Sequence, residues 1–317
     1  MSQLFRWTLI VLAIVGVPTA ALSLLLGVFS SGAGLVLGLV LGAVYTAVIV
    51  LVLRAMPIWP VGGAGAVWVL SCLIWGSGIA TLAAFITTVP VIELTQLTGW
   101  EQAVYSFGGA YPEEIGKALG VVVILMTFRG LNRPWHGLVT GALIGLGFEV
   151  NENIVYGMTL APLDPSADWI GALVVWGVRI VVGPFIHILW TALAGWGIGL
   201  ALFVAGTSVA WRVRTAAVWL LIPFVLHFMW NYSWDSVAVT FIALAVNALV
   251  LYALSIWIFI KAIRMARSDA SYSFTPRPLT SVRDLPAQVM TPAPRPPVTA
   301  PTPQQPGQWP EQQPGSS

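Results

Sequence analysis

The chain has 317 residues, of which 58% are hydrophobic and only 8% carry a charge. An average soluble domain has about 25% charged residues, so this composition indicates an integral membrane protein and excludes a soluble enzyme. The formal net charge of +2 is too small to favour nucleic acid as a partner. The single cysteine, Cys72, allows neither an internal disulfide nor a cysteine metal cluster.

Hydrophobic runs long enough to span a bilayer follow one another along the chain. About 20 mostly apolar residues cross a bilayer as a helix. Runs of that size cover 8–29, 33–53, 64–89, 112–128, 137–158, 184–206, 215–235 and 237–260. The predicted fold class is therefore all-α: a polytopic transmembrane helical bundle of about eight spans in the lipid bilayer.

The positions of the basic residues predict the orientation of the bundle. Lys and Arg gather on the cytoplasmic side of membrane proteins. Here they follow every second crossing, at Arg6, Arg54, 129–133, 212–214 and 261–267. The alternate connections are acidic, so both termini are expected in the cytoplasm. Reading the first run as a cleaved signal peptide is an alternative that leaves the later spans unchanged.

The apolar stretch from Trp169 to Gly206 is too long for one crossing. As a helix it would extend about 57 Å, roughly twice the hydrocarbon thickness. Acidic residues before it and basic residues after it require an odd number of crossings. We therefore expect residues 169–182 to form a re-entrant or interfacial helix on the outer side, with a break at Gly183-Pro184. Arg179 on this helix is expected near the outer surface.

The composition changes abruptly after the last span. Residues 1–263 are expected to form the transmembrane domain, with a motif-bearing core at about 105–235. Residues 264–317 are rich in Pro and Gln, which predicts a disordered cytoplasmic tail. The segment 294–297 is a possible polyproline ligand, and a plain solvated tail is the alternative.

Acidic, amide and histidine side chains interrupt four of the predicted spans. Each ionisable group near the middle of a membrane helix costs roughly 2.5–3.5 kcal/mol, so their retention indicates a function. They are Glu113, Glu114 and Lys117 in the fourth span, Glu149, Glu152 and Asn153 in the fifth, His187 in the sixth, and His227 and Asn231 in the seventh. All are expected in the outer half of the membrane, and this common depth predicts one convergent site.

A stripe of small residues predicts which face of the fifth span points inward. Residues three or four apart share a helix face, so Gly137, Gly141 and Gly145 lie on the face that carries Glu149 and Asn153. Small residues let helices pack closely in lipid. The second span has a similar stripe without any charge, which packing alone explains: Gly34, Gly38 and Gly42.

Adjacent carboxylates suit a hydrolase that works inside a membrane, because such an enzyme must activate water. Two carboxylates so close together hinder each other's ionisation, so one of them can accept a proton near neutral pH. We expect Glu113, which faces the bundle, to act as the general base and Glu114 to tune it, with Lys117 as an ion-pair partner. A helix start with an acidic first turn and an intrahelical pair is the alternative for Glu114 and Lys117.

The two histidines have two possible roles. His187 and His227 either donate hydrogen bonds to the oxyanion or, as neutral imidazoles, bind zinc with Glu152 as the third ligand. The sequence has no pair of histidines flanking a glutamate on one helix turn. A metal-free glutamic mechanism is therefore slightly preferred, and zinc is the alternative. Asn153 and Asn231 are expected to link helices by hydrogen bonds.

Four motifs occur in order on successive spans: Glu113-Glu114-x-x-Lys117, Phe148-Glu149-x-x-Glu152-Asn153, Pro184-x-x-His187-x-x-Trp190 and His227-x-x-Trp230-Asn231. Together they resemble the motifs of the PrsW family of intramembrane proteases, which is distantly related to the CAAX prenyl endopeptidase and Abi membrane proteases. The resemblance implies a glutamic-type or metal-dependent endopeptidase of a bacterial inner or plasma membrane. Its substrate would be a membrane-tethered protein, such as an anti-sigma factor, cut on the extracytoplasmic side.

The predicted site residues form two sets. The catalytic set is Glu113, Glu114, Glu149, Glu152, His187 and His227. The supporting set is Lys117, Asn153, Trp190 and Asn231.

Intramembrane glutamates also occur in proton relays and ion pathways, so a proton- or ion-coupled transporter is the main alternative. Such transporters tend to have two interrupted helices at matching positions, whereas Gly183-Pro184 is the one clear break here. A non-catalytic scaffold or sensor is a further alternative.

Overall fold

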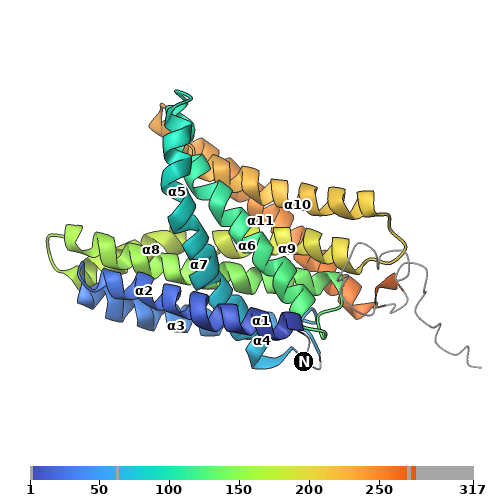
Figure 1. Cartoon of the computed structure of the whole chain (residues 1–317). Coiled ribbons are helices and arrows are strands. Elements are labelled where there is room, and N and C mark those ends of the chain that lie inside the picture. The colour runs from blue at the N-terminus through green and yellow to red at the C-terminus, as the bar shows by residue number, and fades with distance from the viewer. Residues whose placement is uncertain (1–2, 62–63, 270–272, 276–317) are drawn as a thin grey trace, which may run out of the picture.

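Figure 1 shows a computed structural model of the chain, which describes residues 3–61, 64–269 and 273–275. Within these residues the chain is helical throughout, apart from turns and one isolated β-bridge between Val204 and Phe274. The prediction of an all-α bundle is therefore confirmed.

The helices follow the predicted spans closely. They are α1 (Gln3–Val11), α2 (Val17–Gly27), α3 (Gly32–Arg54), α4 (Gly65–Ile74), α5 (Thr81–Gln96), α6 (Val104–Thr127), α7 (Pro134–Leu160), α8 (Asp168–Val182), α9 (Ile186–Phe203), α10 (Val209–Trp230) and α11 (Val237–Arg267). Short π-helical segments, η1 (Leu12–Gly16) and η2 (Trp75–Ala80), join α1 to α2 and α4 to α5. The remaining elements are the 3-10 turns η3 (Glu101–Ala103) and η4 (Ala161–Leu163).

In the part of the chain that the structure describes, seven helical segments are long and apolar enough to cross a membrane. They are Gln3–Gly27, Gly32–Arg54, Gly65–Gln96, Pro134–Leu163, Ile186–Phe203, Val209–Trp230 and Val237–Arg267. The 24-residue α6 has the length of a span and also carries Glu113, Glu114 and Lys117. Together, these segments and α6 correspond to the eight predicted runs. Which ends face the cytoplasm stays a prediction.

The start of α6 differs from the sequence-based expectation. The helix begins at Val104 rather than at residue 112, and Pro112 lies inside it. The expected start was wrong because the residues before Pro112 include Gly, Ser and Tyr instead of a continuous apolar run, and because proline usually marks a first turn. Glu113 and Glu114 consequently lie near the middle of α6. The alternative of an acidic first turn is excluded.

The central helix α7 packs against α9 almost backbone to backbone. A Cβ atom placed on Gly137, Gly141 or Gly145 would overlap a backbone oxygen of α9, so only glycine permits this approach. The predicted inward direction of this face is therefore confirmed. The uncharged stripe on α3 packs against the other end of α7, where Gly38 contacts Ile154. That prediction is also confirmed.

The long apolar stretch forms two helices separated by a sharp break. α8 ends at Gly183, and Phe185 adopts a left-handed conformation with φ of 64° before α9 begins at Ile186. The two helices run antiparallel to α7, so that Trp176 of α8 lies at Gly157 and His187 of α9 lies at Gly145. Figure 1 shows α8 beside α7. The predicted short helix thus exists, and it packs against α3 and α7.

At the other end of the bundle, α11 continues through Arg267, past the boundary expected at residue 263. Asp269 forms an ion pair with Arg133 at 3.0 Å, and Phe274 packs against Trp135. The rest of the predicted tail, with the segment 294–297, lies outside the described residues.

Candidate active site

A cavity of about 380 Å³ lies between α5, α6, α7, α9 and α10, with α8 at one side. Each of these helices contributes at least one polar side chain to the cavity lining, and α9 and α10 each contribute a histidine. Its polar lining includes Glu113, Glu152, Arg179, His187, His227 and Asn231. The four spans α6, α7, α9 and α10 thus meet at one site, as the sequence predicts.

Lys117 lies at the centre of the polar cluster. Its Nζ is 2.6 Å from Glu114 Oε1, 3.5 Å from Glu113 Oε2 and 3.1 Å from His187 Nδ1. The ammonium also lies 4.5 Å from the ring centre of Phe148. Because Lys117 is fully buried, these contacts replace its hydration, and removal of its partners would leave an unpaired buried charge.

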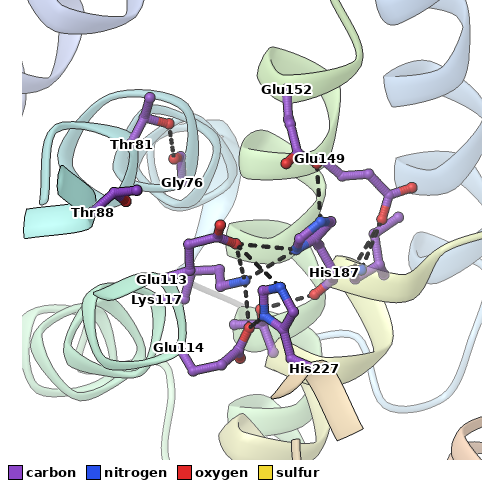
Figure 2. Close-up of polar contacts among 12 residues, drawn as sticks. Gly76, Thr81, Thr88, Glu113, Glu114, Lys117, Glu149, Glu152, His187 and His227 are labelled. Atoms are coloured by element: carbon purple, nitrogen blue, oxygen red, sulfur yellow. Dashed lines mark hydrogen bonds and ion pairs between the residues drawn. The ribbon is translucent and has the colours of Figure 1, made fainter. Parts of the chain in front are cut away.

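The ring of His187 connects α7 to α6. Its Nε2 lies 3.0 Å from Glu152 Oε2, and its Nδ1 lies 3.1 Å from Lys117 Nζ. Since an ammonium has only donors, a neutral His187 accepts at Nδ1 and donates its Nε2 proton to Glu152. Both ring nitrogens are therefore occupied. Figure 2 shows this imidazole between the two groups of carboxylates.

His227 is oriented by α6 and α9. Its Nδ1 lies 2.9 Å from Glu114 Oε1, and its ring stacks on Trp190 with 4.2 Å between ring centres. Donation from Nδ1 to the carboxylate fixes the tautomer and leaves Nε2 facing the cavity, 3.9 Å from Glu113 Oε2. Trp190 thus packs on the ring of His227, and its supporting role stays a prediction.

The two adjacent glutamates have different surroundings. Glu114 is 1% exposed and bonds to Lys117 and His227, whereas the side chain of Glu113 is 12% exposed and lines the cavity. Glu113 Oε2 has no hydrogen-bond partner among the described residues, although it is buried. One oxygen of Glu114 likewise has no hydrogen bond in the part of the chain that the structure describes, so it is the exposure of the Glu113 side chain at the cavity wall that makes its carboxylate available to a water molecule or a substrate.

Glu149 holds the start of α9 instead of lining the main cavity. Its Oε2 accepts hydrogen bonds from the backbone N–H groups of His187 at 3.1 Å and Ile188 at 3.3 Å. Its Oε1 accepts one from the hydroxyl of Tyr45 at 2.6 Å. A carboxylate at a helix N-terminus satisfies otherwise unpaired donors there. The geometry gives Glu149 the means to position His187.

Two residues of the site were not in the predicted set. Arg179 of α8 pairs with Glu152 and donates a hydrogen bond to Asn153, so it lies at the cavity and not merely at the outer surface. Tyr45 belongs to α3, whose glycine stripe suggested packing only. A charged residue in an apolar stretch is a signal of a polar site, and Arg179 carried that signal. Nothing in the sequence around Tyr45 indicated a contact with the site.

The remaining predicted residues also take up defined positions. Asn153 links α7 to α8 through Arg179, as expected for an interhelical hydrogen bond. Asn231 ends α10 and lines the cavity beside Gly109. Their roles in catalysis stay predictions.

The helices and the cavity together define a multi-pass membrane protein with an enzyme-like cluster of carboxylates and imidazoles. Residues 64–260 match the model of the family described as PrsW family intramembrane metalloprotease, and the chain belongs to this family. It is an intramembrane protease, and this finding favours peptide hydrolysis over the transport alternative. The match extends beyond the predicted motif region to α4, α5 and most of α11. No curated protein and no solved structure matches the chain.

The family description includes a metal, and the site has suitable donors for one. Ligand atoms of Glu113, Glu114, His187 and His227 lie within 4.8 Å of one another. Imidazole and carboxylate are common zinc ligands, and one oxygen of each of these glutamates has no hydrogen-bond partner among the described residues. Glu152, the predicted third ligand, lies outside this group, at the other nitrogen of His187.

Lys117 contacts three of these four residues, so its ammonium already supplies a positive charge to the group. A divalent ion would have to displace it or tolerate its repulsion. The donors therefore fit zinc, and Lys117 competes with it.

Proposed function

We propose that this protease hydrolyses a peptide bond of a membrane-tethered protein with water activated by Glu113. The single observation that supports this role best is the position of the Glu113 side chain, which is 12% exposed and lines the polar cavity. Glu114 is 1% exposed and bound to Lys117 and His227, and Glu152 is bound to Arg179 and His187. A general base must lie within hydrogen-bond reach of the water whose proton it accepts.

In the proposed reaction, the oxygen of a water molecule attacks the carbonyl carbon of the scissile bond while Glu113 accepts a proton. The carbonyl oxygen takes up negative charge in the tetrahedral intermediate. Glu113 then delivers the proton to the leaving nitrogen as the carbon–nitrogen bond breaks, which yields a carboxyl group and an amine. One base thus serves as both acceptor and donor.

His227 is the imidazole best placed to stabilise the oxyanion. Its Nδ1 is bound by Glu114, and its Nε2 faces the cavity. When protonated, Nε2 donates to the oxyanion, and the charge of the ring is balanced by Glu114. His187 has both nitrogens occupied, so we assign it to the positioning of Lys117 and Glu152.

When zinc is bound, it would be held by His227 and Glu113, with His187 or Glu114 as a further ligand, and would act as a Lewis acid on water or a carbonyl. Neutral His227 would then offer the lone pair of Nε2 in place of a proton. The metal-free route is the one we prefer, because Lys117 already compensates the charge of the carboxylates.

We propose that the substrate is cut toward the extracytoplasmic face of a bacterial cell membrane. The placement of Lys and Arg between the spans supports this orientation. An anti-sigma factor, or another single-span protein that begins a regulated cascade, suits such a position.

The base is tested by a pair of substitutions. Glu113→Gln keeps the size of the side chain but cannot accept a proton from water, and we expect cleavage to fall by about two to four orders of magnitude. Glu114→Gln should reduce it less. Thermal melting in detergent must show that both variants are folded. Full activity of folded Glu113→Gln would overturn this mechanism.

Metal dependence is tested by metal analysis of purified protein and by cleavage before and after chelation. We expect activity to persist in strong chelator. In Lys117→Met, which removes the competing ammonium, we expect more zinc per chain than in the wild type. Stoichiometric zinc in the wild type, with loss of activity on chelation, would favour the metal route instead.

A further inference from the structure

A second cavity of about 350 Å³ adjoins the active-site cavity between α5 and α7. Both are lined by Thr88, Glu113, Glu152 and Tyr156, so they meet at the proposed base. Figure 2 shows Thr88 on the α5 side of Glu113 and Glu152 on the α7 side. The volume falls within the range of about 300–1,000 Å³ that is common for ligand pockets.

The walls of this second cavity are mainly apolar, and its charged groups lie at one end. Ala84, Phe85 and Val89 line it from α5, and Phe148 and Val155 line it from α7. Phe85 and Val89 are more than half exposed. Because these residues belong to a membrane-spanning segment, the cavity opens toward lipid at that end, while Glu113 and Glu152 lie at the inner end.

We propose that this cavity is a subsite for a large apolar side chain, such as Leu, Met, Phe or Trp, on the substrate residue next to the scissile bond. This inference rests on the proposed hydrolysis at Glu113. Consecutive Cα atoms are about 3.8 Å apart, so a peptide bond held at Glu113 brings a flanking side chain to the mouth of the cavity. The charged inner end excludes a second apolar group there, and the opening between α5 and α7 lets the substrate enter from the bilayer.

The substrate preference that follows is measurable. Burial of a large apolar side chain, relative to alanine, should raise kcat/KM by about tenfold to a hundredfold. The preference should apply to one flanking position only, since the cavity lies on one side of Glu113.

The probe is a peptide library made by digesting a bacterial proteome. The purified protein cleaves it in detergent, and mass spectrometry of the new termini gives the residues that flank each cut. We expect one flanking position to be rich in large apolar residues. Ala84→Trp and Val155→Phe fill the cavity from opposite walls, and both should shift that position toward Gly and Ala.

Ile86→Trp is the matched control. Ile86 belongs to α5, is 64% exposed and does not line either cavity. This variant should keep the wild-type preference. An unchanged preference in both cavity variants, with both shown to be folded by melting, would overturn the subsite.

A second measurement does not depend on turnover. Synthetic peptides that carry benzoylphenylalanine at a position flanking the expected cleavage site are bound to Glu113→Gln and irradiated. Labelling should fall on Ala84, Val155 or Thr159 and should be lost in Ala84→Trp. If the wild type cleaves nothing but this labelling occurs, the proposed function fails while the subsite stands. If cleavage occurs without labelling here, the subsite alone is wrong.

Discussion

The two helices that run back along α7 are attached to it in different ways. α9 meets α7 through glycines that bring the two backbones together at Gly137, Gly141 and Gly145. Along α7 itself, α8 contacts this helix through side chains, chiefly Trp176 and Arg179, and its backbone comes close only at Gly171, which faces Ala161 just after α7 ends. The chain thus fixes His187 by close backbone packing, while Arg179 joins the cavity wall through side-chain contacts.

Between the two helices, the largest effect should follow from removing the histidine of α9. His187→Ala breaks the link from Glu152 to Lys117, and we expect cleavage to fall by about a hundredfold or more through misplacement of the charged groups. Arg179→Met on α8 should lower it by less than about tenfold, because Arg179 pairs with Glu152 and Asn153 in a partly exposed position and not with the proposed base. Cleavage assays on folded protein measure both, and equal losses would contradict the distinction between the two helices.

A second large effect should appear in stability. Gly145→Ala places a methyl group against a backbone oxygen of α9, and we expect a loss of about 2–3 kcal/mol. Gly157→Ala is the comparison at α8, since its Cβ would lie 3.1 Å from the Trp176 side chain, a tight contact but not an overlap with backbone. Melting in detergent should show a clearly larger fall in Tm for the first variant. A similar Tm for both would mean that α9 is not the more tightly packed helix.

An intermediate effect is expected where α7 holds the start of α9. Tyr45→Phe removes one hydrogen bond to Glu149, and we expect a loss of about 1 kcal/mol. Glu149→Gln replaces a charged acceptor of two backbone N–H groups and should cost about 1–2 kcal/mol. Equilibrium unfolding in denaturant gives the change in free energy of unfolding for both variants. If neither variant changes stability, this cap does not position His187.

The smallest effects are expected on α8. The Arg179 and Glu152 side chains are 24% and 22% exposed, so Arg179→Met should cost less than about 1 kcal/mol. At Gly177 an added Cβ meets nothing within 4 Å in the described part of the chain, so Gly177→Ala should not lower stability. A large loss of Tm in either variant would show that α8 is as firmly held as α9.

The sequence predicts which residues form the site better than it predicts the partners that hold them in place. Helical spacing and depth bring Glu113, Glu152, His187 and His227 together, because a regular helix fixes which residues share a face. Periodicity does not reveal which residue of another helix will lie opposite that face. Tyr45 and Arg179 were therefore missed as partners, since each meets its glutamate through packing between helices distant in the sequence.

The start of α6 shows a second limit of sequence reasoning. A run of apolar residues is a good signal of a span only when the span faces lipid, and α6 lies against α5, α7 and α10. The buried glycines and serine at its start pack against neighbouring helices instead of lipid. Ser106, for example, donates a hydrogen bond from its hydroxyl to the backbone carbonyl of Phe228 in α10, with 2.8 Å between the oxygens. The apolar signal therefore begins later than the helix.

The glycines of α7 also determine where its carboxylates lie relative to α9. They fix how far the helix slides and turns against α9, and the same helix then carries Glu149 and Glu152 to the two ends of His187. One residue inserted between Gly145 and Glu149 would rotate both carboxylates by about 100° away from their partners. Insertions in the connecting loops change no such angle. Length variation in this protein is therefore expected in the loops, while the count of residues along α7 is held constant.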